Sequence, residues 1–532
     1  MNVIPGFTSA FKKCNFTLYE PEIGNNNIVY HGILSAQKHG EVEIDFLFDD
    51  DAFVSFPHAK IGINSQNKFR PFHFPHLDDS WNLCYHDNSR VFDRYDPERM
   101  VRFCIDNVKF VLNNTIEDDM KEIKKEFSSY WCAKTEHCYS FLSLKDMTAY
   151  TQANWLVSPN VSIKIADGPN KEVPVFKLPN TPSIADIEWP LEKYASFQAW
   201  VNKSSPETEK EIQKYIKRKI GEKCSKIRII IFLEDITTYL GLEIEYKHPM
   251  YNIKARILRY ETIDSIFNGN HIFHRFTIDN YNAEKIITSN VSPNSSTLIN
   301  KKILLIGAGT IGSNLGNLLV KNGAGIGDDA LFTIVDYDNY EPYNYSRHFL
   351  GIKYSGYKKA KKMKIELEYA FPFTKINVYE KPIQYVDFDH YDIIIDSTGE
   401  EGLTQWLNER NKKYNLCGLF ISAWIYGQGV AAQCFVQPNN KEACHECFRK
   451  SEHYAEKNIS TLPLRDSCNS IYIPFPITAS MYVVLLVIHI LNKWLEGQLT
   501  ETTFFTQTLN PVSEIIETII TKNKECPLCG KD

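Results

Sequence analysis

The chain has 532 residues, of which 43% are hydrophobic and 23% are charged, and its formal net charge is −6. Domains usually span about 100–200 residues, so this length predicts roughly three of them. The composition is that of a folded globular protein, and no block of basic residues indicates a nucleic-acid ligand. No repeat of fixed period is visible, which excludes solenoid and propeller architectures.

The features that report on compartment predict a cytoplasmic protein without a membrane partner. Residues Met1–Phe16 lack the basic start and apolar run of a secretory signal. The most apolar stretch, Ile477–Leu491, is shorter than the roughly 20 residues that span a bilayer, so it predicts a buried helix. Thirteen cysteines, an odd number, favour a reducing compartment in which thiols serve metal binding or catalysis.

The first predicted domain, residues 1–125, is a small α+β unit. After Glu41 the segments VEIDFLF and AFVSF alternate like short strands. From Asp96 the segment DPERMVRFCIDNVKFVL has apolar residues at helical spacing. The charged stretch Glu117–Glu126 is expected to continue this helix into a linker.

The second predicted domain, residues 126–293, is an α/β linker domain. Its clearest element is KIRIIIFLE, Lys226–Glu234, which predicts a buried strand, and the turn-rich Asn290–Thr297 marks its end. From Lys301 the pattern changes to strand, glycine turn, helix and strand. This pattern predicts a doubly wound, mainly parallel α/β sheet in a third domain, residues 294–532.

A glycine turn opens the third domain. The segment KKILLIGAGTIGSNLGNLLVKNG places an apolar strand before Gly307, Gly309 and Gly312 and a helix after them. These glycines permit a tight turn, a close approach of backbone to phosphate and close packing of helix on strand, and the helix N-terminus offers N–H groups to an anion. The turn predicts a nucleotide site, and by itself it leaves open both ATP and the NAD of a dehydrogenase.

Charged residues after the turn favour a triphosphate. The segment LFTIVDYDNYE ends a strand with Asp336 and Asp338, where carboxylates can hold ribose hydroxyls. Asn344, Arg347 and Lys359 follow, and this cationic set suits a triphosphate better than a dinucleotide.

A further carboxylate, Asp396, ends the apolar strand HYDIIID. It is expected at the carboxyl edge of the sheet, where it could position Mg²⁺. Taken singly, each basic residue in this region is more often a solvated surface group, so the order of the series carries the argument.

These motifs resemble the ThiF/MoeB and ubiquitin-activating adenylyltransferase family over about Leu298–Asp532. The family pattern GxGxxGS, D-x-D, N-x-x-R, K-A and a later aspartate reads here as GAGTIGS, DYD, NYSR, KKA and IIID. The resemblance implies that a protein C-terminal carboxylate attacks the α-phosphate of ATP and releases pyrophosphate, and that the protein is a homodimer. It assigns ribose and metal to Asp336 and Asp338, phosphates to Asn344, Arg347 and Lys359, and Mg²⁺ to Asp396. The sequence departs from the family pattern at one point. Family members often have a pair of arginines ahead of the glycine loop, and here only Arg275 is an obvious candidate.

Two C-x-x-C pairs predict a zinc site. Cys444 and Cys447 form C-H-E-C, and Cys526 and Cys529 form C-P-L-C. Two such pairs supply the four thiolates of a closed structural Zn²⁺ site, and the same arrangement is found in the adenylyltransferase family. The alternative, a redox-active C-x-x-C, is disfavoured because a second pair is present.

Cys468 is a candidate nucleophile between the two zinc pairs. It lies in LPLRDSCNSIYIPFPITASMYVVLL, in a polar turn before a long apolar helix, and Arg465 would help to lower its pKa. The resemblance places the family's crossover loop here and implies that Cys468 captures the acyl adenylate as a thioester. A buried spectator cysteine is the alternative.

Cys84 is the second candidate nucleophile. Its surroundings, FHFPHLDDSWNLCYHDNSRVFDRYDPERMVRF, resemble the active-site region of ubiquitin-conjugating enzymes over about Gly40–Leu112. The usual His-Pro-Asn is absent, since Pro75-His76-Leu77 stands in its place, so the oxyanion donor is unidentified. His76 and Asp87 are candidates to contribute, although a structural role is more common for such residues.

The whole arrangement resembles the fused activating and conjugating proteins of bacterial cyclic-oligonucleotide (CBASS) anti-phage defence. That resemblance implies that the acyl donor is the C-terminus of a cGAS-like nucleotidyltransferase, that residues 126–293 are related to an inactive adenylation domain, and that the acyl group passes from Cys468 to Cys84 and then to an unknown amine acceptor. Two alternatives stay open: a sulfur-carrier adenylyltransferase, which has no need of Cys84, and a scaffold that only senses nucleotide.

Overall fold

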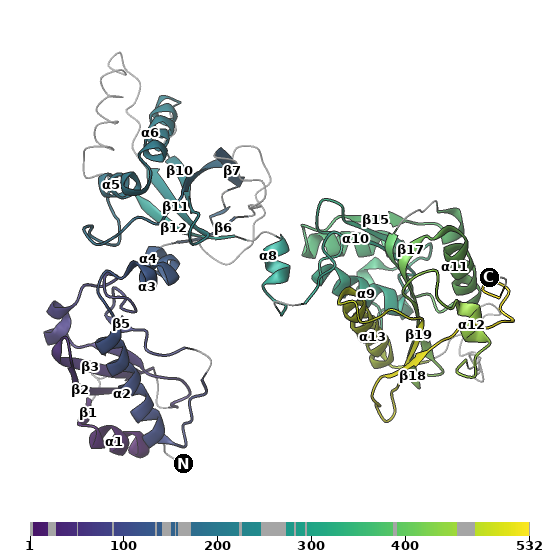
Figure 1. Cartoon of the computed structure of the whole chain (residues 1–532), viewed down its shortest axis with the longest axis horizontal. Helices are drawn as coiled ribbons and strands as arrows, with labels where there is room; N and C mark the ends of the chain where they lie inside the picture. Colours follow the sequence, from purple (N-terminus) through teal and green to yellow (C-terminus); the bar gives the residue numbers. More distant parts are fainter. Residues whose placement is uncertain are drawn as a thin grey trace. The chain divides into compact units, whose positions relative to one another are not determined.

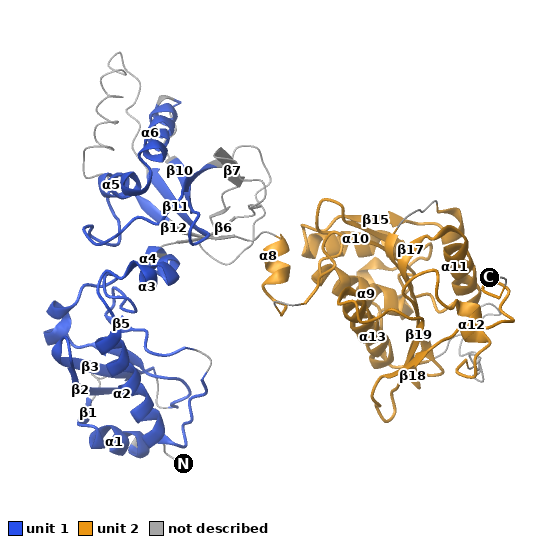
Figure 2. Ribbon diagram, viewed as in Figure 1, with its two compact units in different colours: residues 1–281 blue, residues 282–532 orange. Residues whose placement is uncertain are grey.

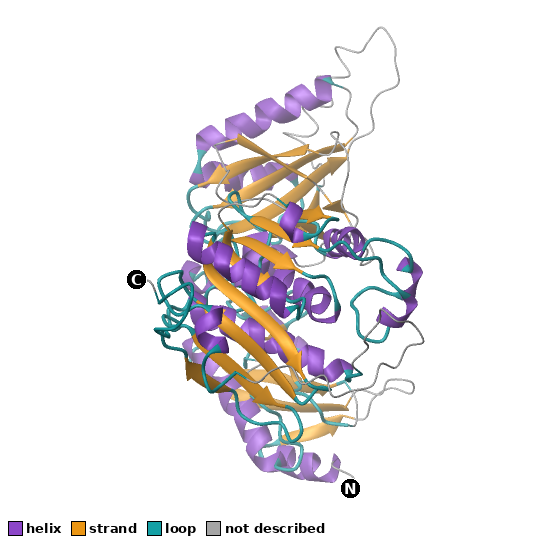
Figure 3. Cartoon of the chain, turned by 90° about the vertical axis from the view of Figure 1, so that its right-hand side faces the viewer, coloured by secondary structure: helices purple, strands orange, loops and turns teal. Residues whose placement is uncertain are grey.

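The computed structural model describes residues 4–19, 28–49, 52–87, 90–132, 136–140, 150–154, 156–157, 172–222, 226–245, 273–280, 283–292, 295–386, 391–454 and 474–530. The chain divides into two compact units, residues 1–281 and 282–532 (Figures 1 and 2). The described residues form three sheets, two in the first unit and one in the second, and Figure 3 distinguishes their strands from the helices. The predicted domain boundaries near residues 125 and 293 stay predictions.

The first sheet is antiparallel throughout and has the order β1-β2-β3-β4-β5. Its elements are α1 (Ile4–Lys13), β1 (Phe16–Tyr19), β2 (Ile28–Ala36), β3 (Gly40–Phe48), β4 (His58–Ile61), η1 (Ile63–Lys68), β5 (Asn82–Leu83) and α2 (Pro97–Asn114). In β3 the alternate residues Val42, Ile44 and Phe46 are buried, as the period of two requires for a sheet with one covered face. The predicted strand here and the predicted helix after Asp96 are confirmed.

Two local predictions in this region are wrong. The segment AFVSF is a loop, because Phe53 adopts a positive φ of 51° and stacks on Phe7 with the ring centroids 4.5 Å apart. The long helix does not continue through the charged stretch, because α2 ends at Asn114 and Asp118 has a φ of 59°. A new helix then begins, with the Asp119 carboxylate accepting the backbone N–H of Lys121.

The second sheet is mixed and has the order β7-β9-β10-β11-β12-β6-β8. Its elements are α3 (Met120–Lys125), α4 (Phe127–Cys132), β6 (Glu136–Ser140), β7 (Tyr150–Asn154), β8 (Leu156–Val157), β9 (Glu172–Leu178), α5 (Tyr194–Ser204), α6 (Pro206–Gly221), β10 (Lys226–Leu233), β11 (Thr238–Glu245) and β12 (His274–Asn280). The predicted strand over residues 226–234 is confirmed as β10, whose Ile229 and Ile231 lie in one core with Trp131 of α4 and Trp200 of α5.

The third sheet has the order β15-β14-β13-β16-β17-β18-β19-β20, parallel from β15 to β17 and antiparallel beyond. Its strands are β13 (Lys302–Ile306), β14 (Leu331–Val335), β15 (Ile376–Tyr379), β16 (Tyr391–Asp396), β17 (Cys417–Tyr426), β18 (Ala431–Gln437), β19 (Thr503–Thr508) and β20 (Ile516–Ile519). Its helices are α8 (Ala283–Thr288), α9 (Thr310–Lys321), η3 (Pro342–Asn344), η4 (Ile352–Tyr354), α10 (Lys359–Ala370), η5 (Ile383–Tyr385), α11 (Glu401–Tyr414), α12 (His445–Arg449) and α13 (Ile477–Leu495).

Helices cover both faces of this sheet. From β13, Ile303 and Leu305 enter one core with α9, α10 and α13, whereas Leu304 and Ile306 enter a second core with α11 and α12. Strand order reverses at β13, which lies between β14 and β16. The doubly wound, mainly parallel sheet is therefore confirmed, and its switch point is where such sheets bind ligands.

The apolar helix α13 is long and apolar enough to cross a membrane by length and composition. It packs on α9, β17 and β18, and its Val483, Val487 and Ile490 are buried in the core of the second unit. The predicted buried helix is confirmed.

Candidate active sites

The glycine turn joins β13 to α9. Gly307 has a φ of 90°, a conformation that side chains with a Cβ rarely adopt. At Gly312 an added Cβ would stand 1.9 Å from the backbone oxygen of Gly307, so the helix can approach the strand only without a side chain there. The turn is thus closed tightly over the end of the strand.

Two side chains hold the Ala308 backbone inside this turn. The Asp336 carboxylate accepts the Ala308 N–H at 2.6 Å, and the His348 Nε2 donates to the Ala308 oxygen at 2.7 Å. The His348 Nδ1 accepts the Leu350 N–H at 3.0 Å, which fixes the neutral tautomer. Burial lowers the pKa of His348 to about 4, so the ring is uncharged at neutral pH. No sequence motif marks His348.

A cavity of about 450 Å³ lies at the carboxyl ends of β13, β14 and β16. Five of the predicted nucleotide residues line it, namely Gly307, Gly309, Asp336, Asp338 and Lys359. Lys359 is only 8% exposed, and its Nζ lies 3.0 Å from the exposed carboxylate of Asp338. The cavity therefore places a cation and carboxylates beside backbone N–H groups at a helix N-terminus, which suits a phosphorylated ligand.

The other four predicted nucleotide residues lie outside the cavity lining. Gly312 packs beneath the turn, and Asn344 accepts the Glu341 N–H at 2.8 Å. The Arg347 guanidinium lies 4.2 Å from the ring centroid of Phe475, which itself lines the cavity.

Asp396 is completely buried beneath the cavity. One carboxylate oxygen accepts the N–H and hydroxyl of Thr398 at 3.0 and 2.7 Å, and the other accepts the Thr404 hydroxyl at 2.6 Å. The role of Asp396 at Mg²⁺ stays a prediction. Cavity residues that sequence reasoning missed are Lys381, Gln384, Glu400 and Trp424, and no motif distinguishes them.

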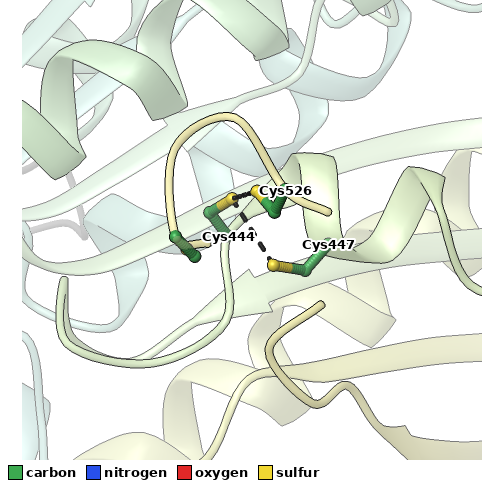
Figure 4. A group of neighbouring side chains, drawn as sticks. Cys444, Cys447 and Cys526 are labelled. Carbon is green, nitrogen blue, oxygen red and sulfur yellow. Dashed lines mark hydrogen bonds between the residues drawn. The ribbon is translucent and has the colours of Figure 1, made fainter. Parts of the chain in front are cut away.

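The four predicted zinc ligands lie together. Cys444, Cys447, Cys526 and Cys529 are buried, and their sulfur atoms all lie within 4.8 Å of one another. The Cys444 sulfur is 3.4 Å from that of Cys526 and 3.8 Å from that of Cys447 (Figure 4). Tetrahedral Zn²⁺ with bonds of about 2.3 Å separates its sulfur ligands by about 3.8 Å. The cluster fits zinc, and four converging thiols are more than a redox pair requires.

Cys84 lies on the surface directly after β5 and lines a cavity of about 900 Å³. Its backbone N–H donates to the oxygen of His76 at 2.8 Å, and His76 also lines this cavity. Partial burial and the negative charge of Glu126 raise the pKa of Cys84. Asp87 does not line the cavity, and its backbone oxygen contacts the His86 ring.

The arginine that precedes the glycine loop in the sequence lies in the second sheet. Arg275 lies on β12 of the first unit, where its guanidinium donates to the backbone oxygen of Trp131 at 3.0 Å. Cys468 and Arg465 lie outside the described residues.

Two family models match separate parts of the chain. The ThiF family matches residues 283–528, and Prokaryotic E2 family B matches residues 18–139. The chain is a fused ubiquitin-activating-like and ubiquitin-conjugating-like protein. This confirms the resemblance to the CBASS-type fused proteins predicted from its motifs.

Relatives of this fused protein match along most of their length. The ATP-dependent ubiquitin transferase-like protein Cap2 of Pseudomonas aeruginosa is 26% identical over 86% of this chain and 87% of its own length. Proteins of the same name from Escherichia coli and Vibrio cholerae are each 22% identical, covering 92% and 83% of this chain and 92% and 84% of their own. The fused protein is accordingly an enzyme, a ligase of the ubiquitin-activating and ubiquitin-conjugating type, and its ThiF domain supports the use of ATP.

Solved structures give a weaker match. Escherichia coli MccB with succinimide is 16% identical, covers 64% of this chain and 89% of its own, and has a TM-score of 0.36. MccB with ATP is 15% identical, covers 64% and 85%, and has a TM-score of 0.35. Scores this low add nothing to the assignment of the site.

Proposed function

We propose that the fused protein activates a protein C-terminal carboxylate with ATP, captures the acyl group on Cys468, transfers it to Cys84 and joins it to a target amine. The observation that carries the proposal is the pairing, in one chain, of the glycine-turn cavity with a surface cysteine that lines a second large cavity. An adenylation site alone would serve many chemistries, whereas the added thiol favours a thioester relay.

In the first step the carboxylate oxygen attacks the α-phosphorus of ATP, and pyrophosphate leaves. Gly307 and Gly309 allow backbone N–H groups to approach the phosphates, and Lys359 offsets their charge. We assign the ribose to Asp336 and Asp338, as the family pattern indicates. For Asn344 and Arg347, a contact with phosphate requires that they turn toward the cavity.

Mg²⁺, when bound, neutralises part of the phosphate charge. Of the carboxylates at the switch point, Asp338 and Glu400 are exposed on the cavity wall, whereas Asp396 is enclosed by hydroxyl groups. Oxygen ligands suited to Mg²⁺ are therefore present. Asp396 contributes indirectly, because its hydrogen bonds to Thr398 hold part of the cavity wall in place.

Three acyl transfers follow. The Cys468 thiolate attacks the acyl adenylate and AMP leaves; the Cys84 thiolate attacks that thioester and Cys468 leaves; an amine attacks the second thioester and Cys84 leaves. Each step breaks an activated acyl bond; the first two form a thioester and the third forms a stable amide, so ATP provides the driving force only once. The Cys₄ zinc site is closed to substrate and ties the residues around Cys526 to α12.

We further propose that the donor is a cGAS-like nucleotidyltransferase, that the enzyme is a cytoplasmic homodimer and that it serves anti-phage defence. The relatives named Cap2 support a protein or peptide substrate for the transfer.

The test combines pyrophosphate exchange with trapping. Incubation with ATP and the candidate donor is expected to give an adduct that a thiol reductant removes. Cys468→Ala should abolish the adduct, and Cys84→Ala should leave the acyl group on Cys468. Normal function of Cys84→Ala would favour the sulfur-carrier alternative, and absence of pyrophosphate exchange with every carboxyl-terminal donor would favour a scaffold.

A further inference from the structure

The backbone at His76 ties this residue to Cys84. His76 has a φ of 70°, a left-handed conformation that is uncommon for residues other than glycine and that asparagine, aspartate and histidine adopt more often than the rest. Its backbone oxygen accepts the Cys84 N–H at 2.8 Å. Local strain of this kind persists only where surrounding structure enforces it, and it is concentrated at functional sites.

Three hydrogen bonds orient the His76 ring and its backbone. The His76 Nδ1 lies 2.7 Å from one carboxylate oxygen of Glu126. The Tyr130 hydroxyl donates to the other oxygen of Glu126 at 3.0 Å and accepts the His76 N–H at 3.3 Å. Because Nδ1 is engaged, Nε2 is the ring nitrogen that can exchange a proton with a molecule in the cavity.

Glu126 and Tyr130 belong to the α3–α4 segment, which is built into the core beneath the second sheet. Phe127 and Trp131 of α4 are completely buried there with Trp200 of α5. The second sheet thereby fixes the two residues that hold His76, so the region predicted as a linker contributes directly to the wall of the Cys84 cavity.

The charges around the cavity favour an ionisable ring at His76. The hydrogen bond to Glu126 raises the pKa of His76, with the negative charge of Glu122 adding to it and burial and Lys125 opposing it. Burial alone would raise the pKa of Glu126. The hydrogen bonds from His76 and Tyr130 have the larger effect, so the pKa of Glu126 is lowered. Further titratable groups on the cavity wall are Asp49, His58, Asp78, Tyr85, His86 and Arg90.

We propose that His76 is the general base for the final amine transfer from Cys84 and that Glu126 and Tyr130 are the positioning residues that orient it. The proposal rests on the proposed thioester at Cys84. It assigns to the α3–α4 segment a part in conjugation, in addition to joining two domains.

The proposed step balances without any further reactant. The amine nitrogen attacks the thioester carbonyl carbon, the new C–N bond forms, and the C–S bond breaks with its electron pair on the Cys84 sulfur. The amine proton passes to His76 Nε2 and from there to the departing thiolate. Since burial and Glu126 raise the pKa of Cys84, that thiolate readily accepts the proton.

The test uses a probe that bypasses ATP and the unidentified donor. The full-length chain carrying Cys468→Ala is loaded at Cys84 by exchange with a short peptide thioester, and excess probe is removed. Discharge to 2,2,2-trifluoroethylamine, which is largely uncharged over the range, is then followed in a single turnover from pH 6 to pH 9. Loading that does not depend on Cys84 would contradict the proposed function itself and is seen before any discharge is measured.

The variants are chosen to keep the fold. His76→Asn preserves a residue type that tolerates the left-handed backbone, and Glu126→Gln preserves an oxygen toward Nδ1. The matched control is His31→Gln. His31 Nδ1 also lies 2.7 Å from a carboxylate oxygen, that of Asp45 on the neighbouring strand of the first sheet, and neither His31 nor Asp45 lines the cavity.

General base catalysis typically contributes about 10²- to 10⁴-fold, so His76→Asn is expected to slow discharge at least about 10²-fold and to abolish the inflection above pH 6.5. Glu126→Gln should move that inflection to lower pH, Tyr130→Phe should slow discharge by less, and His31→Gln should match the parent. Loading of all variants at the parent rate would show that the cavity is intact. Discharge of His76→Asn at the parent rate with the same inflection would overturn the proposal.

Discussion

His348 donates a hydrogen bond to the backbone oxygen of Ala308, and the Asp336 carboxylate accepts the backbone N–H of the same residue. The glycine turn is therefore held by residues of two later segments. Its shape does not depend on the glycines alone, and its neighbours set the direction of the backbone N–H groups toward the cavity.

Replacing His348 by phenylalanine should weaken ATP binding about tenfold, because the Ala308 oxygen loses its buried donor at a cost of about 1–3 kcal/mol. Calorimetric titration with ATP measures the change. An unchanged dissociation constant would show that the turn holds its shape without this bond.

Burial of His348 also leads us to expect that the stability of the second unit depends on pH. The pKa of His348 is about 4 in the folded chain and close to 6.5 when unfolded, so the unfolded chain binds more protons between these values. The free energy of unfolding of the second unit should fall as pH decreases from about 6.5 to about 4. Urea titrations should give a shallower fall for His348→Gln, and parallel curves would contradict the assignment.

Gly312→Ala should abolish pyrophosphate exchange, because the new Cβ would stand 1.9 Å from the Gly307 oxygen and must push the helix from the strand. Overpacking of this kind costs about 1–3 kcal/mol in stability. Gly402→Ala is the control, since nothing lies within 4 Å of its Cβ position in helix α11. Equal exchange rates for the two variants would contradict this account of the turn.

Zinc should copurify with the chain at about one equivalent, measured by elemental mass spectrometry, given the four sulfur ligands. Cys526→Ser should lose most of the metal and lower the melting temperature by several degrees, because bound metal contributes folding free energy. Cys434→Ser is a useful comparison, since this buried cysteine lies on β18 and is not in the cluster. Full metal content in Cys526→Ser would remove this residue from the ligand set.

The His76–Glu126 pair makes a separate stability prediction. Because the pKa of His76 is raised, the stability that His76 contributes is lost as pH rises through that pKa. Because the pKa of Glu126 is lowered, the stability that Glu126 contributes is lost as pH falls through the pKa of Glu126. A double-mutant cycle should therefore give a coupling of about 1 kcal/mol near pH 6 and almost none at pH 9. Equal coupling at both pH values would show that the bond does not depend on a charged imidazole.

Sequence patterns predicted those features that are local in the chain. A buried strand, three spaced glycines and a helix lie within Lys302–Lys321, so their geometry follows from neighbouring residues. The zinc cluster joins segments 82 residues apart, and it was predictable because two C-x-x-C pairs together form the four-thiolate ligand set of a structural zinc site. The loop at Phe53 was not, because ring stacking with Phe7 overrides the alternation that indicated a strand.

Other contacts between distant segments left no such signal. His76 and Glu126 are 50 residues apart, and nothing in either segment indicates the other. His348 reaches Ala308 across 40 residues in the same way. The burial of Asp396 under Thr398 and Thr404 is also tertiary, since the pattern IIID fixes only where the strand ends.

The most direct test of the central claim is peptide mass mapping of the adduct trapped after incubation with ATP and a protein donor. The account predicts a donor C-terminus joined as a thioester to Cys84, and to Cys468 when Cys84 is replaced by alanine. A chain that binds NAD at the glycine turn and carries no adduct on either cysteine would contradict it.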